Sequence, residues 1–271
     1  MALTLPSGTG GRPPSGFPLA LEVEGLSHGY GERTVLQDIN LTVPAGSLVV
    51  LAGPSGCGKS TLLRLIAGLE MPVRGRVLLA GEEFTGRPGR VGLVFQEAAL
   101  YPWLTVAGNA AFGLRIQGRP RNEISARVRE FLELVGLTEA ARLYPHQLSG
   151  GMAQRAALAR ALVTFPRVLL LDEPFGSVDQ QLRNRLQAEL VRLWQATGST
   201  IILVTHSVDE AVFVGERILL MASSGRLAGD IQVPLAYPRD RHEACFLELR
   251  EDVLSWLSEE SDLVDVQPSV T

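Results

Sequence analysis

The sequence predicts an α/β fold with a parallel-sheet core, a small antiparallel β subdomain and a helical subdomain inserted into the core. Two observations support this fold class. Short apolar runs that suit buried strands alternate with helical patterns in residues 47–95 and again in residues 168–221. Between these stretches, residues 105–165 show no strand pattern and look mainly helical, with apolar side chains at helical spacing in residues 122–135. The helical subdomain is therefore expected to interrupt the sheet-forming sequence.

The spacing of apolar residues places the individual elements. Residues 19–30 and 35–43 alternate as antiparallel strands do, and the pattern is broken at the turn residues Gly29-Tyr30-Gly31. The other strands are expected at residues 47–52, 77–80, 91–95, 168–171, 200–204 and 217–221. Helices are expected at residues 59–69, 122–135, 151–164, about 179–196, after His206 and about 243–257.

The chain is expected to have three regions. Residues 1–18 are rich in glycine, proline and serine and are predicted to be a flexible leader without a signal-peptide pattern. Residues 19–240 form the main domain, whose helical subdomain spans about residues 97–165. Residues 241–271 form a helix and an acidic tail. The uncharged run 98–114 has 17 residues and includes proline, glycine and asparagine, whereas a membrane span needs about 20 mostly apolar residues.

Composition narrows the class of protein. The chain has 271 residues, 46% of them hydrophobic, which is enough for one or two domains with a sizeable core. The formal net charge is −4 and the pI is about 5.7, so the charge gives no support to a nucleic-acid binder. The only two cysteines, Cys57 and Cys245, lie far apart in the sequence. Two distant cysteines argue against a fold built on disulfides and fit a protein of a reducing compartment.

One motif points to phosphate binding. Residues 53–61 match the pattern G-x-x-x-x-G-K-[ST], and they lie between an expected strand and an expected helix, which is the context that the motif requires. Glycines allow the backbone N–H groups to wrap a phosphate, and the helix N-terminus adds partial positive charge. The expected nucleotide-binding residues are Gly53, Pro54, Ser55, Gly56, Cys57, Gly58, Lys59, Ser60 and Thr61. The alternative is a glycine-rich turn without a ligand.

Each polar group of this loop has an expected role in a P-loop NTPase. Lys59 should reach the β- and γ-phosphates of ATP, Ser60 should bind Mg²⁺, and Thr61 should bond the α-phosphate. Asp172 and Glu173 follow the apolar run 168–171, so they should lie at the carboxyl edge of the sheet, where ligands bind. We expect Asp172 to hold Mg²⁺ and Glu173 to polarise the attacking water. The alternative is that Asp172 and Glu173 are two solvated charges at the start of a loop.

A second glycine motif suggests a second anion site. Residues 148–155 read Leu-Ser-Gly-Gly-Met-Ala-Gln-Arg and begin an expected helix, where Ser149, Gly150 and Gly151 can contact an anion. Two anion sites for one nucleotide are unusual unless two copies of the chain share it.

Together these motifs resemble the ATP-binding cassette (ABC) family, and specifically the subunits of ABC importers. The resemblance covers about residues 20–225, and the Leu-Ser-Gly-Gly signature at 148–151 is highly specific. It implies an ATPase dimer in which two cassettes face each other head to tail. Ser149 and Gly151 of one copy would then close over the γ-phosphate held by Lys59 of the other.

The resemblance implies roles for four more residues. Tyr30 corresponds to the aromatic residue that stacks on adenine, with an ordinary turn tyrosine as the alternative. Gln96 corresponds to the glutamine that touches Mg²⁺ or the attacking water and senses the membrane partner. Asp179 belongs to the loop 176–179, which lines the dimer interface. His206 corresponds to the switch histidine at the γ-phosphate, although a lone histidine is more often a surface or core residue.

Three segments, residues 96–106, 172–176 and 234–241, resemble the nitrate/sulfonate/taurine importer branch. This resemblance implies a small cargo such as nitrate, taurine or an alkanesulfonate. The implied partners are a second ABC subunit, integral-membrane permease subunits and, indirectly, a solute-binding protein. The implied location is peripheral, on the cytoplasmic face of the cell membrane.

The uncharged run 98–114 begins directly after Gln96, and exposed apolar patches often mark partner surfaces. We therefore expect this run and the nearby helical subdomain to receive a short coupling helix of the permease. Ordinary core packing of its large side chains is the alternative, which concerns Trp103, Leu104 and Phe112.

Two other functions are compatible with a nucleotide-binding cassette. The first is a soluble ABC-type ATPase that acts without a permease, on DNA or ribosomes. The chain has one cassette and only 53 residues from Gln96 to Ser149, which leaves no room for the long coiled coil of DNA-repair relatives. The second is a scaffold gated by nucleotide without hydrolysis, against which the intact Glu173 and His206 argue.

Overall fold

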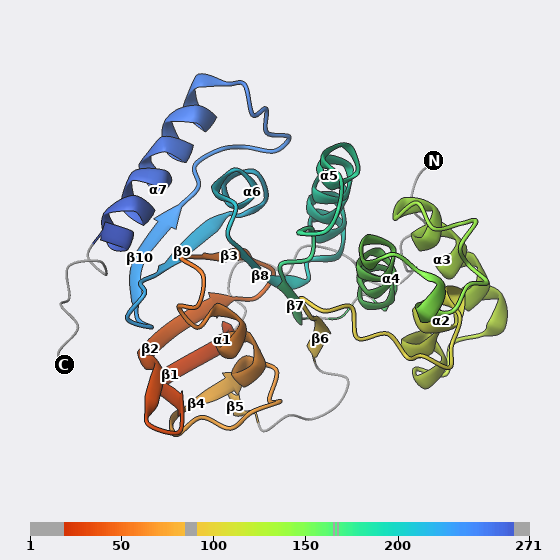
Figure 1. Ribbon diagram of the computed structural model, residues 1–271, viewed down its shortest axis with the longest axis horizontal. Helices are drawn as coiled ribbons and strands as arrows, with labels where there is room; N and C mark the ends of the chain where they lie inside the picture. Colours follow the sequence, from red (N-terminus) through yellow and green to blue (C-terminus); the bar gives the residue numbers. More distant parts are fainter. Residues whose placement is uncertain (1–18, 85–90, 165, 167, 263–271) are drawn as a thin grey trace. The chain divides into compact units, whose positions relative to one another are not determined.

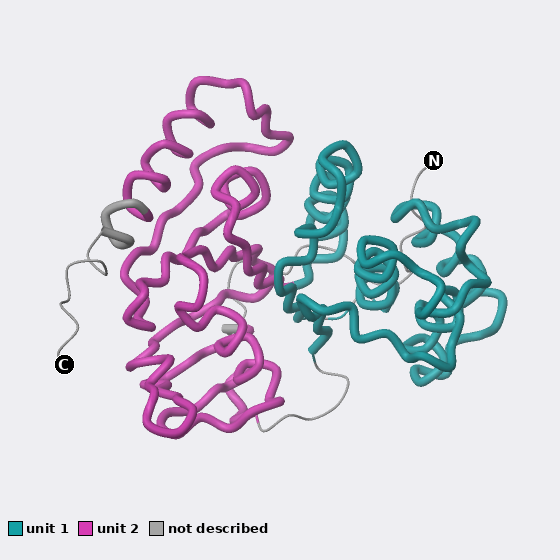
Figure 2. Tube along the Cα trace, viewed as in Figure 1, with its two compact units in different colours: residues 1–12, 89–199 teal, residues 13–88, 200–271 magenta. Residues whose placement is uncertain are grey.

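The computed structural model describes residues 19–84, 91–164, 166 and 168–262. The chain is divided into two compact units (Figure 2). The first unit takes in the described part of residues 89–199, and the second takes in the described parts of residues 13–88 and 200–271. The expected leader at residues 1–18 lies outside the described residues.

The second unit contains a four-stranded antiparallel sheet in the order β2-β1-β4-β5. Its strands are β1 (Leu19–Tyr30), β2 (Arg33–Pro44), β4 (Arg74–Leu79) and β5 (Glu82–Glu83). Alternate residues of β2 from Ile39 through Leu41 to Val43 are buried, as expected for a sheet with one face on the core. The predicted antiparallel pair at the start of the chain is therefore confirmed.

A second sheet in this unit runs in the order β10-β9-β3-β8 (Figure 1). It consists of β3 (Leu48–Ala52), β8 (Thr200–Thr205), β9 (Arg217–Met221) and β10 (Leu227–Gln232). All residues of β3 and β8 are buried, which suits parallel strands covered on both faces. β3 pairs in parallel with β8 and β9, whereas β10 adds an antiparallel edge.

Three helices belong to the same unit. They are α1 (Lys59–Ile66), α6 (Val208–Val214) and α7 (Ala244–Asp262). α6 is packed between β3 and α7 (Figure 1). Phe246 and Val253 of α7 are buried, so the predicted amphipathic C-terminal helix is confirmed. This helix continues five residues beyond its expected end at Leu257, and the rest of the expected tail, residues 263–271, lies outside the described residues.

The first unit contains the parallel pair β6 (Val91–Val94) and β7 (Val168–Asp172). Between them in sequence lie α2 (Val106–Ile116), α3 (Arg121–Leu134), the 3₁₀ turn η1 (Pro145–Gln147) and α4 (Gly150–Leu162), and β7 is followed by α5 (Gln180–Thr197). α2, α3 and α4 pack on one another, and Phe131 of α3 is fully buried. The expected helical stretch between two strand-forming regions is therefore present.

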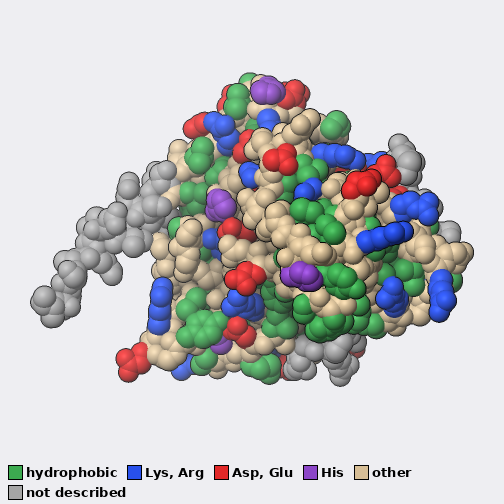
Figure 3. Space-filling view, turned by 45° about the vertical axis from the view of Figure 1, so that its right-hand side comes forward, with side chains coloured by type: hydrophobic (Ala, Val, Ile, Leu, Met, Phe, Trp, Pro, Cys, Tyr) green, Lys and Arg blue, Asp and Glu red, His purple; other side chains and the backbone are tan. Residues whose placement is uncertain are grey.

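Charged and apolar side chains are mixed on one face of the molecule. The face shown in Figure 3 carries acidic, basic and hydrophobic side chains beside one another. Among the described residues, no helix is long and apolar enough to cross a membrane. The most exposed large apolar side chains are Val73, Trp103 and Ile116. Core packing, which was the alternative explanation for Trp103, is wrong for that residue because its side chain is 69% exposed.

Candidate nucleotide-binding and catalytic site

The phosphate loop lies between β3 and α1, as its motif predicts. Two of its glycines have left-handed backbones, Gly56 at φ +79° and Gly58 at φ +104°, and L-residues rarely adopt this conformation. A Cβ atom on Gly53 would lie 2.5 Å from the carbonyl oxygen of Met221 in β9. Glycine is therefore required at position 53 by close backbone approach and at positions 56 and 58 by dihedral angle.

Lys59 is 6% exposed and lies within this loop. Its Nζ donates hydrogen bonds to the carbonyl oxygens of Gly53 at 2.9 Å and Pro54 at 2.7 Å. The ammonium is therefore held inside the ring of backbone that a phosphate would occupy. Burial raises the pKa of the neighbouring Cys57 thiol, although the charge of Lys59 opposes this effect. A raised pKa favours the protonated thiol, which is less nucleophilic than the thiolate.

His206 and the phosphate loop lie at the same edge of one sheet. Ala52, the last residue of β3, pairs in parallel with Thr205, the last residue of β8. Residues 53 and 206 therefore follow neighbouring strand ends, where parallel sheets bind ligands. His206 is exposed there.

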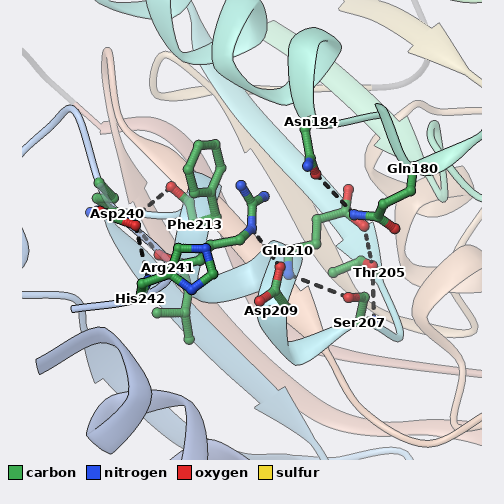
Figure 4. A network of polar contacts seen from close by, with 12 residues as sticks. Gln180, Asn184, Thr205, Ser207, Asp209, Glu210, Phe213, Asp240, Arg241 and His242 are labelled. Atoms are coloured by element: carbon green, nitrogen blue, oxygen red, sulfur yellow. Dashed lines mark hydrogen bonds and ion pairs between the residues drawn. The ribbon is translucent and has the colours of Figure 1, made fainter. Parts of the chain in front are cut away.

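Hydrogen bonds fix the backbone on both sides of His206. The Thr205 hydroxyl donates to Glu210 Oε2 at 2.8 Å and accepts from the Ser207 N–H at 3.0 Å. Ser207 caps α6, because its hydroxyl accepts from the Glu210 N–H at 3.3 Å (Figure 4). His206 thus lies in a strand-to-helix turn whose backbone is fixed by the hydroxyls of Thr205 and Ser207.

Gln96 and Glu173 meet in the first unit. Val94 of β6 pairs in parallel with Leu171 of β7, and each of the two polar residues lies two positions further along its chain. Gln96 Nε2 lies 3.5 Å from Glu173 Oε2. The structure therefore brings together the two side chains that were expected to act on the attacking water.

The backbone at Glu173 is unusual. Glu173 has φ +46°, a left-handed conformation that costs a non-glycine residue about 1–2 kcal/mol. Its carbonyl oxygen accepts a hydrogen bond from the Gly176 N–H at 3.2 Å, which closes a tight turn directly after β7. Strained backbone of this kind concentrates at functional sites. The turn agrees with a catalytic role for the Glu173 side chain.

The expected Mg²⁺ ligands fit that ion by their chemistry. Asp172 ends β7 and is 5% exposed, and Ser60 and Gln96 offer neutral oxygen atoms. Within the described residues there is no group of three or more His, Cys, Asp or Glu side chains that could hold a metal ion. Mg²⁺ is commonly bound by one or two carboxylates together with substrate phosphates, so a single carboxylate is sufficient here.

The second glycine motif forms the start of α4. Ser149 is the N-cap of this helix, and its hydroxyl accepts from the Met152 N–H at 3.3 Å. A Cβ atom on Gly151 would lie 2.7 Å from the carbonyl oxygen of Ser177, whereas nothing lies within 4 Å of one on Gly150. Ser149 and Gly150 are exposed. The motif therefore packs against the loop 176–179 on one side and presents the other side to solvent.

Asp179 and Tyr30 have structural contacts of their own. The Asp179 carboxylate caps α5 by accepting from the Leu182 N–H at 3.0 Å. Tyr30 is the last residue of β1, and its side chain is 50% exposed. The exposure of Tyr30 leaves room for a stacked base, which its proposed role requires.

Two residues that sequence reasoning did not single out support the signature helix. Gln154 is 3% exposed, and its Nε2 donates to the carbonyl oxygen of Phe95, one residue before Gln96. Arg155 Nη1 donates to the carbonyl oxygens of Val135 at 2.9 Å and Gly136 at 3.3 Å, at the end of α3. In the sequence, Gln154 is a polar residue at a helix position that is expected to be buried. Such a residue could equally mean that the helix has been assigned the wrong buried face, so the pattern alone does not reveal its role.

Comparison with known proteins identifies relatives over most of the chain. A family model described as "ABC transporter" matches residues 36–176. An uncharacterised ABC transporter ATP-binding protein of Methanocaldococcus jannaschii is 45% identical over 245 residues, which cover 89% of this chain and 92% of that protein. The aliphatic sulfonates import ATP-binding protein SsuB 2 of Burkholderia lata is also 45% identical, over 87% of this chain and 85% of its own length.

Solved structures show the same architecture. A dimeric ATP-binding cassette in a post-hydrolysis state, bound to ADP and Pi, is 29% identical to this chain and has a TM-score of 0.73. The alignment covers 80% of this chain and all of that one. The predicted P-loop NTPase fold is therefore confirmed.

Proposed function

The chain belongs to the ABC transporter family, and we propose that its ATP-binding and ATP-hydrolysing activity drives the uptake of a small sulfonate or a related oxyanion through a membrane permease. The observation that carries the catalytic part is the pairing of Gln96 with a strained Glu173 at the end of a buried strand. Nothing in the relatives favours the alternative of a soluble ATPase that acts without a permease.

Each residue of the site has a role in phosphoryl transfer. The N–H groups of the phosphate loop and the Lys59 ammonium hold the phosphates, and Lys59 exchanges its bonds to the carbonyls of Gly53 and Pro54 for phosphate oxygens. Glu173 accepts a proton from the attacking water, which Gln96 helps to orient. His206 donates a hydrogen bond toward the γ-phosphate. Most of the catalysis is then positioning and charge stabilisation.

Mg²⁺ would be held by the Ser60 hydroxyl and the Asp172 carboxylate, with Gln96 as a further oxygen donor. When bound, the ion neutralises charge on the β- and γ-phosphates. The residues of this chain would supply one formal negative charge to that ion, and phosphate oxygens and water would complete its ligands.

A complete site requires two copies of the chain. The exposed Ser149 and Gly150 at the start of α4 offer an anion site that the same chain's phosphate loop does not need. We infer that this surface of one copy closes over the γ-phosphate bound by the other, with the Asp179 loop at the interface. The dimeric state of the related ADP-bound cassette supports this arrangement. ATP then biases an equilibrium between open and closed dimers.

The permease contact is expected at a preformed apolar surface in residues 99–105. Trp103 is exposed, and its ring lies 5.5 Å from that of Tyr101, which lies 4.5 Å from the ring of Phe112. The guanidinium of Arg160 lies over the Tyr101 ring, 5.3 Å from the ring centroid. An exposed indole on such a rigid aromatic base suits a partner helix.

Charge substitution separates this contact from catalysis. Trp103→Glu should uncouple uptake from hydrolysis, reducing transport in reconstituted vesicles at least tenfold while basal ATPase stays unchanged. Leu247→Glu, on the exposed face of α7, is the matched control and should leave both activities unchanged. Equal loss of transport and ATPase in Trp103→Glu would contradict the proposed surface.

The cargo is tested with the assembled importer. The chain is co-purified with its permease, and ATPase activity is measured in the presence of the solute-binding protein with alkanesulfonates, taurine, nitrate and uncharged organic solutes. Stimulation by a sulfonate or oxyanion is expected. Stimulation by an uncharged solute alone would contradict the proposed cargo class, whereas the ATPase assignment would stand.

A further inference from the structure

We propose that Glu70 is a positioning residue for the nucleotide base, because it holds the ring of Tyr30 in the orientation in which the base stacks. The inference rests on the proposed function, in which Tyr30 is the stacking residue. It concerns how an exposed side chain at the end of a strand keeps one orientation.

Tyr30 would be free to rotate without a partner. It ends β1 beside the short turn to β2, and half of its side chain is exposed. Immobilising such a side chain on binding lowers affinity, because its rotamer freedom is lost. A contact that fixes the ring beforehand removes this cost.

Glu70 provides that contact from a distant part of the sequence. The Tyr30 hydroxyl donates to Glu70 Oε2 at 2.6 Å, a distance typical of a hydrogen bond to a carboxylate. Glu70 follows α1, the helix that begins at Lys59 in the phosphate loop. Its other oxygen lies 3.8 Å from Arg64 Nη1 on the same helix. One carboxylate therefore links the expected base-binding residue to the helix that carries the phosphate-binding lysine.

His28 supports the ring from behind. It is 9% exposed, and its imidazole meets the Tyr30 ring edge-on at 88°, with the centroids 5.1 Å apart. His28 Nε2 lies 3.4 Å from the same Glu70 oxygen, and neither ring nitrogen has a hydrogen-bond partner among the described residues. Burying polar atoms in this way costs free energy. His28 therefore packs against both the Tyr30 ring and the Glu70 carboxylate, and supports the ring by this packing.

The geometry leaves part of the Tyr30 surface open. The hydroxyl is bonded and one contact of the ring is made by His28, while half of the side chain stays exposed. A planar base can stack on that exposed surface without moving the ring. Stacking is tolerant of base identity, so the clamp favours binding of the base without selecting it by hydrogen bonds.

The test compares a ligand with a base and one without. ATPase activity of the full chain gives kcat and KM for ATP, and competition by inorganic tripolyphosphate gives its inhibition constant. Glu70→Ala should raise KM for ATP about two- to tenfold, corresponding to the ordering cost of one side chain. It should leave kcat and the tripolyphosphate constant unchanged, because the phosphate loop is intact.

Three further variants make the test specific. Glu70→Gln should restore most of the ATP affinity, because its amide oxygen can still accept from the tyrosine. The effects of Tyr30→Phe and Glu70→Ala on KM should not be additive in the double variant, because both substitutions remove the same hydrogen bond. Glu24→Ala breaks an exposed ion pair with Arg76 at 2.7 Å in the same unit and should change nothing.

The outcomes separate the inference from the function on which it rests. If Tyr30→Ala weakens ATP binding but Glu70→Ala does not, Glu70 is not a positioning residue. A parallel rise in the ATP and tripolyphosphate constants of Glu70→Ala would also overturn the inference, since it would place the damage in the phosphate loop. If Tyr30→Ala leaves the ratio of the two constants unchanged, the stacking role of Tyr30 itself is wrong.

Discussion

Arg239 allows a quantitative prediction about α6, the helix that follows His206. Its guanidinium is 8% exposed and donates to the carbonyl oxygens of Val212 at 2.6 Å, Gly215 at 2.7 Å and Leu235 at 3.0 Å. Two of these carbonyls belong to the C-terminal end of α6, where cations are favoured. Burial lowers the pKa of the Arg239 guanidinium. Because burial disfavours the charged guanidinium, the hydrogen bonds to these carbonyls are needed to keep Arg239 in this position.

The magnitude follows from the bonds that would be lost. Arg239→Met leaves the buried carbonyls of Val212 and Gly215 without this donor, at about 1–3 kcal/mol each. The free energy of unfolding should fall by about 2–6 kcal/mol, which corresponds to about 4–24 °C in Tm for a chain of this size. Loss of the cation–π contact with Tyr237, at 4.0 Å from its ring centroid, adds to the effect.

Thermal unfolding followed by circular dichroism measures this change, and hydrogen exchange shows whether α6 opens first. Arg239→Lys keeps the charge but cannot reach all these carbonyls, so it should be intermediate. Arg226→Ala, which removes an exposed arginine bonded to Gln37, is the matched control and should change stability by less than about 0.5 kcal/mol. A Tm of Arg239→Met within about 1 °C of wild type would refute the reasoning.

Two further predictions concern the first unit and the phosphate loop. Asn109 is fully buried, and its amide bonds the backbone of Tyr101, Leu104 and Thr105, so Asn109→Ala should cost about 2–4 kcal/mol in urea unfolding. The exposed Asn122→Ala is its control, and equal midpoints for the two variants would contradict the prediction. Gly53→Ala places a Cβ atom 2.5 Å from the Met221 carbonyl and should weaken ATP binding more than tenfold. Protection of Lys59, the only lysine of the chain, from an amine-reactive reagent measures that occupancy, and undiminished protection would show that the loop tolerates the change.

Much of the fold could be predicted from the sequence because its strands are short apolar runs. The expected strand at residues 168–171 is fully buried in the structure, and the pattern of residues 19–30 gives β1 with the predicted bounds. β10 was not predicted, because the residues Leu-Ala-Gly-Asp-Ile-Gln combine poor strand formers with an exposed edge. α2 was not resolved from the uncharged run, since nearly all of its positions are apolar or small and no helical periodicity is visible.

The candidate site was predictable to the extent that its residues occur in contiguous motifs. The phosphate loop, the signature and the acidic pair could all be found in this way, and the roles of the individual residues stay predictions. Glu70 and Gln154 could not be found, because each acts through a contact with a residue 40 or 59 positions away. A polar contact over such a separation leaves no periodic pattern, so only the tertiary structure shows it.

The role of Glu173 as the catalytic base can be tested with the Glu173→Gln variant. The substitution keeps the shape of the side chain and its place beside Gln96 but removes the base that accepts the proton. The measurement is single-turnover ATP hydrolysis together with the molar mass of the protein in Mg²⁺ and ATP. We expect hydrolysis to fall by a factor of about 10² to 10⁴ while a stable ATP-bound dimer accumulates. Hydrolysis at the wild-type rate, or a protein that stays monomeric with ATP bound, would contradict it.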